Sequence, residues 1–259
     1  MMGIDRRKFI KLSGLTALGL AGHSLADTLS SAKLPTTLPH EHPLIGKRWA
    51  MVIDLKKCRQ HEGCKDCITA CHRIHNVPDF GNPKDEIKWI WEESFEHAFH
   101  EQGHEHINDD LKHSHVLLLC NHCDNPPCTR VCPTQATWKR EKDGIVMMDW
   151  HRCIGCRYCV AACPYGSRSF NWRDPRPFIK EIQAEYPTRM RGVVEKCTFC
   201  DERLAKGLLP ACVEACKEKA MVFGDLEDPE SEVRELLGSH FAIRRKPALG
   251  TQPEVYYLV

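Results

Sequence analysis

Short apolar runs recur along the chain, and each is followed by a group of cysteines. Four runs rich in Val, Ile, Leu and Met precede these groups, at 49–54, 115–119, 145–149 and, more weakly, 193–195. Runs of this length and composition, bounded by polar residues, predict short β-strands. Three further strands are predicted after the second, third and fourth groups, at 136–139, 169–172 and 220–223.

Helical spacing occurs between or after the cysteines. Over 65–76, four residues share one face of a predicted helix: Ile68, Cys71, His72 and His75. Another helix is predicted to end at Gly207, and after Pro210 a further helix carries Cys212 and Cys216. The chain thus repeats a unit of strand, cysteine loop and helix, which predicts an α+β fold.

Sixteen cysteines fall into four groups of four, with none left over. The third group follows the C-x2-C-x2-C-x3-C-P spacing of bacterial cubane ferredoxins. The groups are Cys58, Cys64, Cys67 and Cys71; Cys120, Cys123, Cys128 and Cys132; Cys153, Cys156, Cys159 and Cys163; and Cys197, Cys200, Cys212 and Cys216. At four thiolates per cluster they predict four [4Fe–4S] clusters, and therefore a protein that carries electrons.

Other uses of cysteine fit this pattern less well. Disulfides would be strained because Cys153, Cys156 and Cys159 are so close along the chain. Zinc accepts four cysteines and remains an alternative for the fourth group. A zinc site rarely takes three ligands from one short loop and a fourth followed by proline, as at Cys132 and Cys163. No C-x-x-C-H motif for covalent haem occurs.

The amino terminus predicts where the protein works. Arg6 and Arg7 begin a twin-arginine signal, and a mildly apolar run follows over 12–25. The run ends at a small-x-small site, so residues 1–26 are predicted to be a signal peptide for export to the periplasm. The alternative is a short membrane anchor, but the run is too short and too rich in glycine to span a bilayer well. Export of the folded protein suits clusters that are assembled where thiols stay reduced.

The charge pattern indicates which residues could balance the charge of the clusters or tune them. A formal net charge of +1 fits a globular chain that does not bind nucleic acid. Buried clusters carry negative charge and need nearby cations. His122, between two cysteines, is expected to tune a cluster through its N–H without binding iron. Four cations next to cysteines are candidates for charge compensation, or are ordinary surface charge: Arg130, Arg152, Arg157 and Lys196.

Ligand pairing cannot be read from spacing alone. In two-cluster ferredoxins the fourth cysteine of one group ligates the other cluster. This predicts crossed sets: Cys58, Cys64, Cys67 and Cys216; Cys120, Cys123, Cys128 and Cys163; Cys153, Cys156, Cys159 and Cys132; and Cys197, Cys200, Cys212 and Cys71.

Crossed sets imply two interlocked ferredoxin-like modules. The outer module is predicted over 27–114 and 180–259, and the inserted module over 115–179. Each is too small for a normal hydrophobic core, so we expect the clusters to act as the core. The chain is then expected to be largely unfolded without iron.

The segment 79–114 departs from a minimal ferredoxin plan because it is rich in histidine. His97, His100 and His104 have helical spacing, but no carboxylate or cysteine motif completes a metal or haem site. We interpret the segment as a solvated insertion that packs on a partner, with Trp89 and Trp91 as anchors. His72 and His75 are expected to pack and not to bind metal.

The four cysteine groups resemble those of the four-cluster iron–sulfur subunits of membrane-associated oxidoreductases. That family includes subunits of the dimethyl sulfoxide reductase, polysulfide reductase and formate-dependent nitrite reductase systems. Together with the twin-arginine signal, the stretches 71–78, 170–176 and 192–197 resemble more narrowly the periplasmic iron–sulfur subunit of the DsrMKJOP complex. The wider resemblance also implies the crossed pairing.

This resemblance implies an electron relay without a substrate site of its own. No G-x-G-x-x-G, P-loop, H-E-x-x-H or G-x-S-x-G motif occurs. The implied partners are an integral membrane quinone-interacting subunit, which would hold the chain at the membrane, and a multihaem cytochrome c. Two alternatives stay open. One is the electron-transfer subunit of a periplasmic molybdopterin oxidoreductase of the polysulfide or tetrathionate reductase type, and the other is a freely diffusing periplasmic ferredoxin.

Overall fold

The computed structural model describes residues 42–61 and 63–259. The predicted signal peptide, 1–26, lies outside the described residues, and so does the start of the predicted outer module. Within the described part, no helix has both the length and the apolar character that a bilayer span needs.

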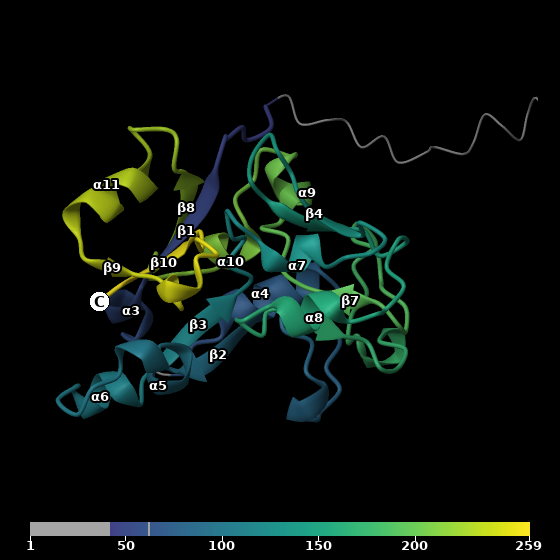
Figure 1. Cartoon of the computed structure of the whole chain (residues 1–259), viewed down its shortest axis with the longest axis horizontal. Coiled ribbons are helices and arrows are strands. Elements are labelled where there is room, and N and C mark those ends of the chain that lie inside the picture. The colour runs from purple at the N-terminus through teal and green to yellow at the C-terminus, as the bar shows by residue number, and fades with distance from the viewer. Residues whose placement is uncertain (1–41, 62) are drawn as a thin grey trace, which may run out of the picture. The chain divides into compact units, whose positions relative to one another are not determined.

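A four-stranded sheet brings together strands from both ends of the described chain (Figure 1). Its second strand is β1 (Trp49–Asp54), which pairs antiparallel with β8 (Met221–Asp225) and parallel with β10 (Val255–Leu258). β9 (Ala242–Ile243) pairs with the other edge of β10. Because β1 has a neighbour on each side, five of its six residues are buried. β1 has the predicted bounds, whereas no strand was predicted at β9 or β10.

A second pair of strands contradicts the prediction for 79–114. β2 (Ile90–Ser94) pairs antiparallel with β3 (His115–Leu119), and Ile90 lies opposite Leu119. Trp89 is 0 % exposed and Trp91 is 5 % exposed, so neither ring can anchor a partner. The segment was expected to be solvated, but it supplies a strand and two tryptophans to the interior.

A buried ion pair explains why Trp89 faces inward. The Trp89 Nε1–H donates to Glu195 Oε2 at 2.9 Å. Glu195 also forms an ion pair with Arg189 at 2.6 Å, and both side chains are fully buried. The guanidinium of Arg189 lies over the Trp89 ring, 5.4 Å from its centroid. The indole N–H therefore has an acceptor inside the protein, and a cation lies over the ring. Both polar requirements of Trp89 are met without a second subunit.

The histidines of this segment do not form one helical face. Between β2 and β3 lie α5 (Phe95–Ala98), the 3₁₀ turn η2 (His100–Gln102) and α6 (Asp109–Lys112). The first helix ends at Phe99, so His97, His100 and His104 do not belong to a continuous helix. Phe95 and Phe99 turn into the core instead, with ring centroids 4.9 Å apart.

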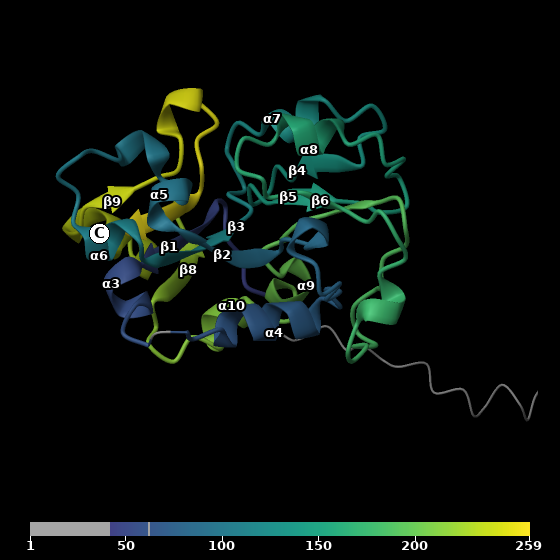
Figure 2. The ribbon, with the colours of Figure 1, turned by 90° about the horizontal axis from the view of Figure 1, so that it is seen from below.

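Smaller two-stranded sheets are formed within residues 137–195, in the teal and green part of the ribbon on the right-hand side of Figure 2. β4 (Thr137–Lys139) pairs with β5 (Val146–Met148), and β6 (Ser169–Phe170) pairs with β7 (Val194–Glu195). Two short helices, α7 (Pro127–Arg130) and α8 (Tyr158–Ala162), carry cysteines of this part. All four strands lie within segments predicted as strands.

Among the remaining helices of the described chain, only α4 and α11 have more than four residues. The remaining helices are α3 (Leu55–Cys58), α4 (Asp66–Ile74), α9 (Asp201–Leu204), α10 (Ala211–Glu214) and α11 (Glu232–Ser239), with 3₁₀ turns η1 (Pro83–Asp85), η3 (Arg176–Phe178) and η4 (Pro247–Leu249). One expectation fails here, because α10 carries Cys212 but ends before Cys216. Cys216 lies in the turn that follows.

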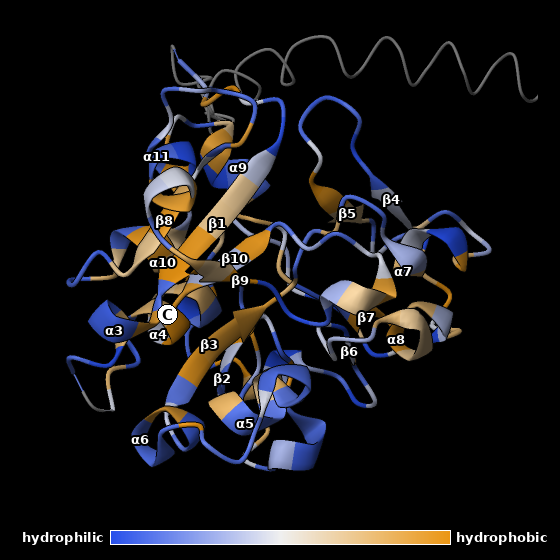
Figure 3. Cartoon of the chain, turned by 60° about the vertical axis from the view of Figure 1, so that its left-hand side comes forward, coloured by the Kyte–Doolittle hydropathy of each residue, from blue (hydrophilic) through white to orange (hydrophobic). Residues whose placement is uncertain are grey.

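A large apolar core joins the two main sheets, as the orange β1 and β3 indicate in Figure 3. Met51, Ile53, Leu118 and Tyr257 are each 1 % exposed or less. The expectation that clusters must replace a hydrophobic core is therefore wrong for this part. Around β4 and β5 the buried apolar cluster is much smaller: Cys128, Ala136, Val146, Met148, Cys159 and Val194.

The mixture of short helices and strands confirms the α+β class. The predicted modules share two sheets, because β3 pairs with β2 and β6 pairs with β7. Each pairing joins a strand predicted in the inserted module to a strand predicted in the outer one.

Candidate metal centres

A repeated turn shapes the chain after the fourth cysteine of three groups. Three residues beyond that cysteine, the backbone has a positive φ at Gln135 (52°), Gly166 (67°) and Lys219 (50°). Each of these residues donates its amide to the carbonyl of its cysteine, at 3.2 to 3.5 Å. The turn brings later amides back to the sulfur, and the Ala220 amide donates to Cys216 Sγ at 3.2 Å. Such a concave arrangement of amides favours an anion, such as a thiolate.

The cysteines gather in four sets that differ from the four groups of the sequence. Two sets line separate cavities. The Cys128 set consists of Cys120, Cys123, Cys128 and Cys163, and the Cys159 set consists of Cys132, Cys153, Cys156 and Cys159. In each set three cysteines belong to one sequence group, and the fourth is the last cysteine of the other group.

The two remaining sets are identified by which neighbouring thiolates raise the pKa of each cysteine. Burial raises the pKa of Cys58 to about 11, and the thiolates of Cys216 and Cys64 contribute. Burial likewise raises the pKa of Cys67 to about 12, with contributions from Cys58 and Cys216. We call these four residues the Cys67 set: Cys58, Cys64, Cys67 and Cys216.

The last set lies deepest. Cys71 is fully buried, and burial raises its pKa well above the ordinary value. The charges of four other cysteines raise it further, with Cys67 contributing least. The three larger contributors define the Cys71 set: Cys71, Cys197, Cys200 and Cys212. A neutral thiol is favoured at such a site unless a metal takes the place of the proton.

Cys132 shows how the backbone prepares a thiolate. Burial raises its pKa, but the amides of Thr137, Ala136 and Thr134 and the Thr134 hydroxyl outweigh burial and lower it below the ordinary value. Hydrogen bonds to the charged form therefore favour the thiolate of Cys132 more than burial disfavours it.

The buried cations provide a test of whether negative clusters fit these cavities. Arg168 is 4 % exposed and its Nη2–H donates to Cys128 Sγ at 3.0 Å. Among the described residues no carboxylate forms an ion pair with Arg168. A buried guanidinium needs an anion, and the cysteine sulfurs are the groups that face it. Iron–sulfur clusters, with their negatively charged thiolate shells, therefore fit the charges of this site.

The four cations predicted beside ligands have different positions. Lys196 is fully buried, and its Nζ donates to the carbonyls of Cys197 and Val146. The other three are exposed. Their partners are not cysteines: Arg130 bonds Asn125, Arg152 pairs with Asp149, and Arg157 lies over the Trp172 ring. Sequence reasoning missed Arg168, which is five residues beyond the nearest cysteine.

His122 lies between the Cys128 set and the Cys71 set. Its ring stacks on Phe199 with centroids 3.7 Å apart, and its Nδ1 accepts the amide of Val146 at 3.1 Å. Burial lowers its pKa far below the ordinary value, and the charges of Lys196 and Arg168 lower it further. The ring is therefore neutral and carries its proton on Nε2.

His72 and His75 pack as expected. The Nδ1–H of His75 donates to the Cys71 carbonyl at 2.8 Å, and its Nε2 lies 3.0 Å from Glu202 Oε1. The Nε2–H of His72 donates to the Ile90 carbonyl at 3.1 Å. These nitrogens are occupied by oxygen acceptors.

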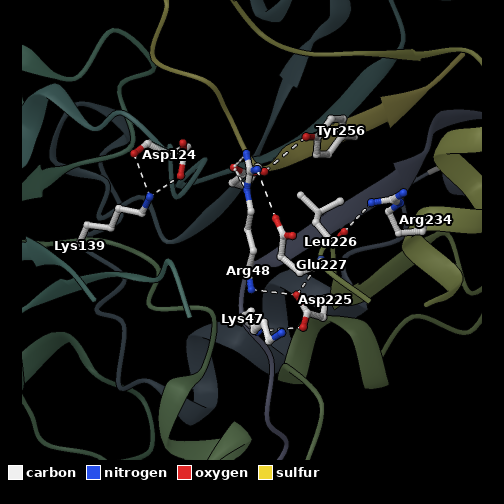
Figure 4. A network of polar contacts seen from close by, with 10 residues as sticks. Lys47, Arg48, Asp124, Lys139, Asp225, Leu226, Glu227, Arg234 and Tyr256 are labelled. Carbon is white, nitrogen blue, oxygen red and sulfur yellow. Dashed lines mark hydrogen bonds and ion pairs between the residues drawn. The ribbon is translucent and has the colours of Figure 1, made fainter. Parts of the chain in front are cut away.

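The loop that carries Cys120 and Cys123 is tied to the central sheet, and Figure 4 shows its Asp124 paired with Lys139 beside the contacts of Arg48. The amide of Asp124 donates to the Gln252 carbonyl at 2.8 Å, and its carboxylate pairs with Lys139. Close by, Arg48 pairs with the buried Glu254 at 2.5 Å. The segment before β10 therefore holds this cysteine loop against the sheet.

Comparison with known proteins supports the same chemistry. The family model described as "4Fe-4S dicluster domain" matches residues 112–177 and 182–226. The chain is 40 % identical over 274 residues to the Hdr-like menaquinol oxidoreductase iron-sulfur subunit 1 of Archaeoglobus fulgidus. This alignment covers 98 % of this chain and 97 % of the relative. It is 39 % identical to a tetrathionate reductase subunit of Salmonella typhimurium, covering 99 % of this chain and 89 % of the relative.

The chain belongs to the [4Fe–4S] electron-transfer subunits of oxidoreductase complexes. A third member, the menaquinone reductase iron-sulfur cluster-binding subunit of Nitratidesulfovibrio vulgaris, is 38 % identical and covers 82 % of this chain and 88 % of the relative. The sixteen cysteines of this subunit supply the thiolates for four [4Fe–4S] clusters, as expected. Its role is electron transfer within a complex whose substrate site lies on another subunit.

Proposed function

We propose that this subunit relays single electrons through its four clusters between a quinone-interacting membrane subunit and a cytochrome c. The complex would be a periplasmic, sulfur-metabolising one of the DsrMKJOP type. Relatives named for menaquinol oxidation and menaquinone reduction support the quinone end of this proposal. The twin-arginine signal supports the periplasmic location, with attachment to the membrane through the partner.

The observation that carries the proposal is the gathering of the cysteines into four compact sets. We assign one cluster to each set, which is the crossed assignment. We order the four sets in a single series, and three pairs of neighbouring cysteines support this order. Burial is the main cause of the raised pKa of Cys212, Cys197 and Cys159, and one cysteine of a neighbouring set adds to each: Cys67, Cys120 and Cys128, respectively. The series runs from the Cys67 set through the Cys71 and Cys128 sets to the Cys159 set.

The two ends of this series are the more exposed sets. Cys64 is exposed in the Cys67 set, and Cys153 and Cys156 are half-buried in the Cys159 set. Electrons would enter at one end and leave at the other. In this arrangement the outer module holds the Cys67 and Cys71 sets, and the inserted module holds the other two.

When bound, the clusters supply one-electron redox chemistry. The protein side chains and backbone hold the thiolates in place, exclude water and balance the charge. Amides such as that of Ala220 donate to sulfur, and Arg168 places a cation beside Cys128. His122 stays neutral between two sets, so it adds a dipole and no net charge.

A second candidate is supported by the match to the Salmonella tetrathionate reductase subunit. The partner would then be a molybdopterin-containing catalytic subunit. A freely diffusing periplasmic ferredoxin remains the alternative from a different class.

Purification of the native protein from membranes distinguishes these candidates. We expect the subunit to stay with the membrane fraction and to co-purify with haem c. We also expect menaquinol to reduce its clusters. Co-purification with molybdenum would favour the second candidate, and a monomer in the soluble fraction would favour the ferredoxin.

A further inference from the structure

We infer that Arg168 is a positioning residue that raises the reduction potentials of the two clusters held by the Cys128 and Cys159 sets. The guanidinium acts on both sets because it lies between them. Cys128 and Cys159 bind different clusters whether or not the fourth cysteines cross. The inference therefore needs the clusters but does not depend on the crossed assignment or on the partners proposed above.

The first argument is contact. Nη2 of Arg168 lies 3.0 Å from Cys128 Sγ and 2.9 Å from Thr137 Oγ1. The Thr137 hydroxyl donates in turn to the Met147 carbonyl at 2.7 Å, so its lone pairs face the guanidinium. Nη1 lies 3.9 Å from Met148 Sδ. These contacts fix the planar head group in one orientation.

The second argument is charge. The charges that act most strongly on Arg168 come from cysteines of both sets: Cys128, Cys159, Cys120 and Cys163. In the described part of the chain no carboxylate neutralises this cation within ion-pair distance. Adding an electron makes a cluster more negative, so a fixed, desolvated cation stabilises the reduced form more than the oxidised form. Hydrogen bonds to ligand sulfur act in the same direction.

The third argument is the internal repeat of the chain. Arg168 lies five residues after Cys163, and Thr137 lies five residues after Cys132. Arg168 and Thr137 therefore occupy equivalent positions in the two repeats, and they meet in the structure. Arg168 supplies the cation, and the Thr137 hydroxyl accepts its hydrogen bond. The exposed cations next to cysteines cannot substitute, because solvent and salt screen them.

The experiment is an EPR-monitored redox titration of the cluster-loaded full-length protein. In Arg168→Met, two of the four clusters should have a one-electron reduction constant at least tenfold smaller, a shift of about 59 mV. The other two should keep their potentials. Arg168→Lys retains the charge but lacks the planar head group that the contacts with Cys128, Thr137 and Met148 hold in one orientation, so it should give a smaller shift of the same sign.

Arg152→Gln is the matched control. It removes one positive charge next to Cys153, but this arginine is exposed and paired with Asp149. The four cluster potentials of the Arg152→Gln variant should stay close to those of the wild type. A loaded Arg168→Met with unchanged potentials would overturn the inference.

Failure to load is also informative. If Arg168→Met loses its iron, Arg168→Gln takes its place as the charge-removing variant, and a loaded Arg168→Gln with wild-type potentials contradicts the inference. Loss of only the two clusters beside Arg168 in these charge-removing variants, with all four clusters retained in Arg168→Lys, would show that they need the cation and would support the inference. Loss of the same two clusters in Arg168→Lys as well would overturn it. Loss of all four clusters in both charge-removing variants would reduce Arg168 to a structural role and overturn it.

Discussion

Gly155, between Cys153 and Cys156, shows how closely the chain packs around a cysteine set. Its φ is +69°, and a Cβ at this position would lie 2.3 Å from the Gly192 carbonyl oxygen. Two constraints therefore act on one residue: a left-handed backbone and the neighbouring backbone of the turn at Gly192. Gly166 has a similar φ of +67° but open space around it.

We predict that Gly155→Ala is far more damaging than Gly166→Ala. Gly166→Ala only forces an alanine into the left-handed conformation, which lowers the stability of the fold by about 1–2 kcal/mol. Gly155→Ala must also move the Cys153 loop away from Gly192, so we expect loss of the cluster at the Cys159 set. Iron analysis and thermal unfolding of the two variants measure the difference. Equal effects would contradict this account of the loop.

At the scale of residues, spacing was enough to select the cysteines, because short spacings limit what four thiols can bind. Spacing did not predict Arg168, whose role depends on two repeats coming together in space. It also did not predict the Arg189–Glu195 pair, whose partners are distant in sequence from Trp89. Trp89 and Trp91 were misassigned to a partner because the histidine-rich segment that contains them was interpreted as a solvated insertion.

Among the elements, β2 most changes the interpretation of the sequence. Its residues Ile90–Ser94 include two glutamates, and apolar and polar residues do not alternate along them, so the segment lacks the sequence pattern of a strand. Tertiary pairing with β3 overrides that local signal. β10 was missed for another reason, since it follows the last cysteine group and only its parallel pairing with β1 identifies it. β1 and β3 were predicted with their observed bounds because their apolar residues are continuous.

We predict that Trp89→Ala destabilises the loaded protein by about 3–5 kcal/mol, the usual cost of removing a buried aromatic ring. The change also leaves Glu195 without the indole donor. Trp172→Ala is the control, because that ring is 57 % exposed. Denaturant unfolding should show a large loss for the first variant and little for the second. If Trp89→Ala instead left stability unchanged and weakened a partner complex, the original interpretation of Trp89 would be right.

For the whole molecule, the two kinds of core predict an uneven response to metal removal. The core around β1, β3 and β10 consists of apolar side chains, whereas few apolar residues surround β4 and β5. After chelation we expect hydrogen exchange to speed up strongly in β4, β5 and the cysteine loops, and much less in β1 and β10. Uniform loss of protection would show that the clusters are the core throughout, as first predicted from the sequence.

The most direct test of the account is whether Cys163 shares a cluster with Cys128 or with Cys159. The double variants Cys128→Ala/Cys163→Ala and Cys159→Ala/Cys163→Ala remove the same number of thiols. Mössbauer and EPR spectroscopy then count the intact [4Fe–4S] clusters. The crossed assignment predicts that the first pair damages one cluster and the second pair damages two. The reverse result would contradict the crossed sets, and with them the order of the relay.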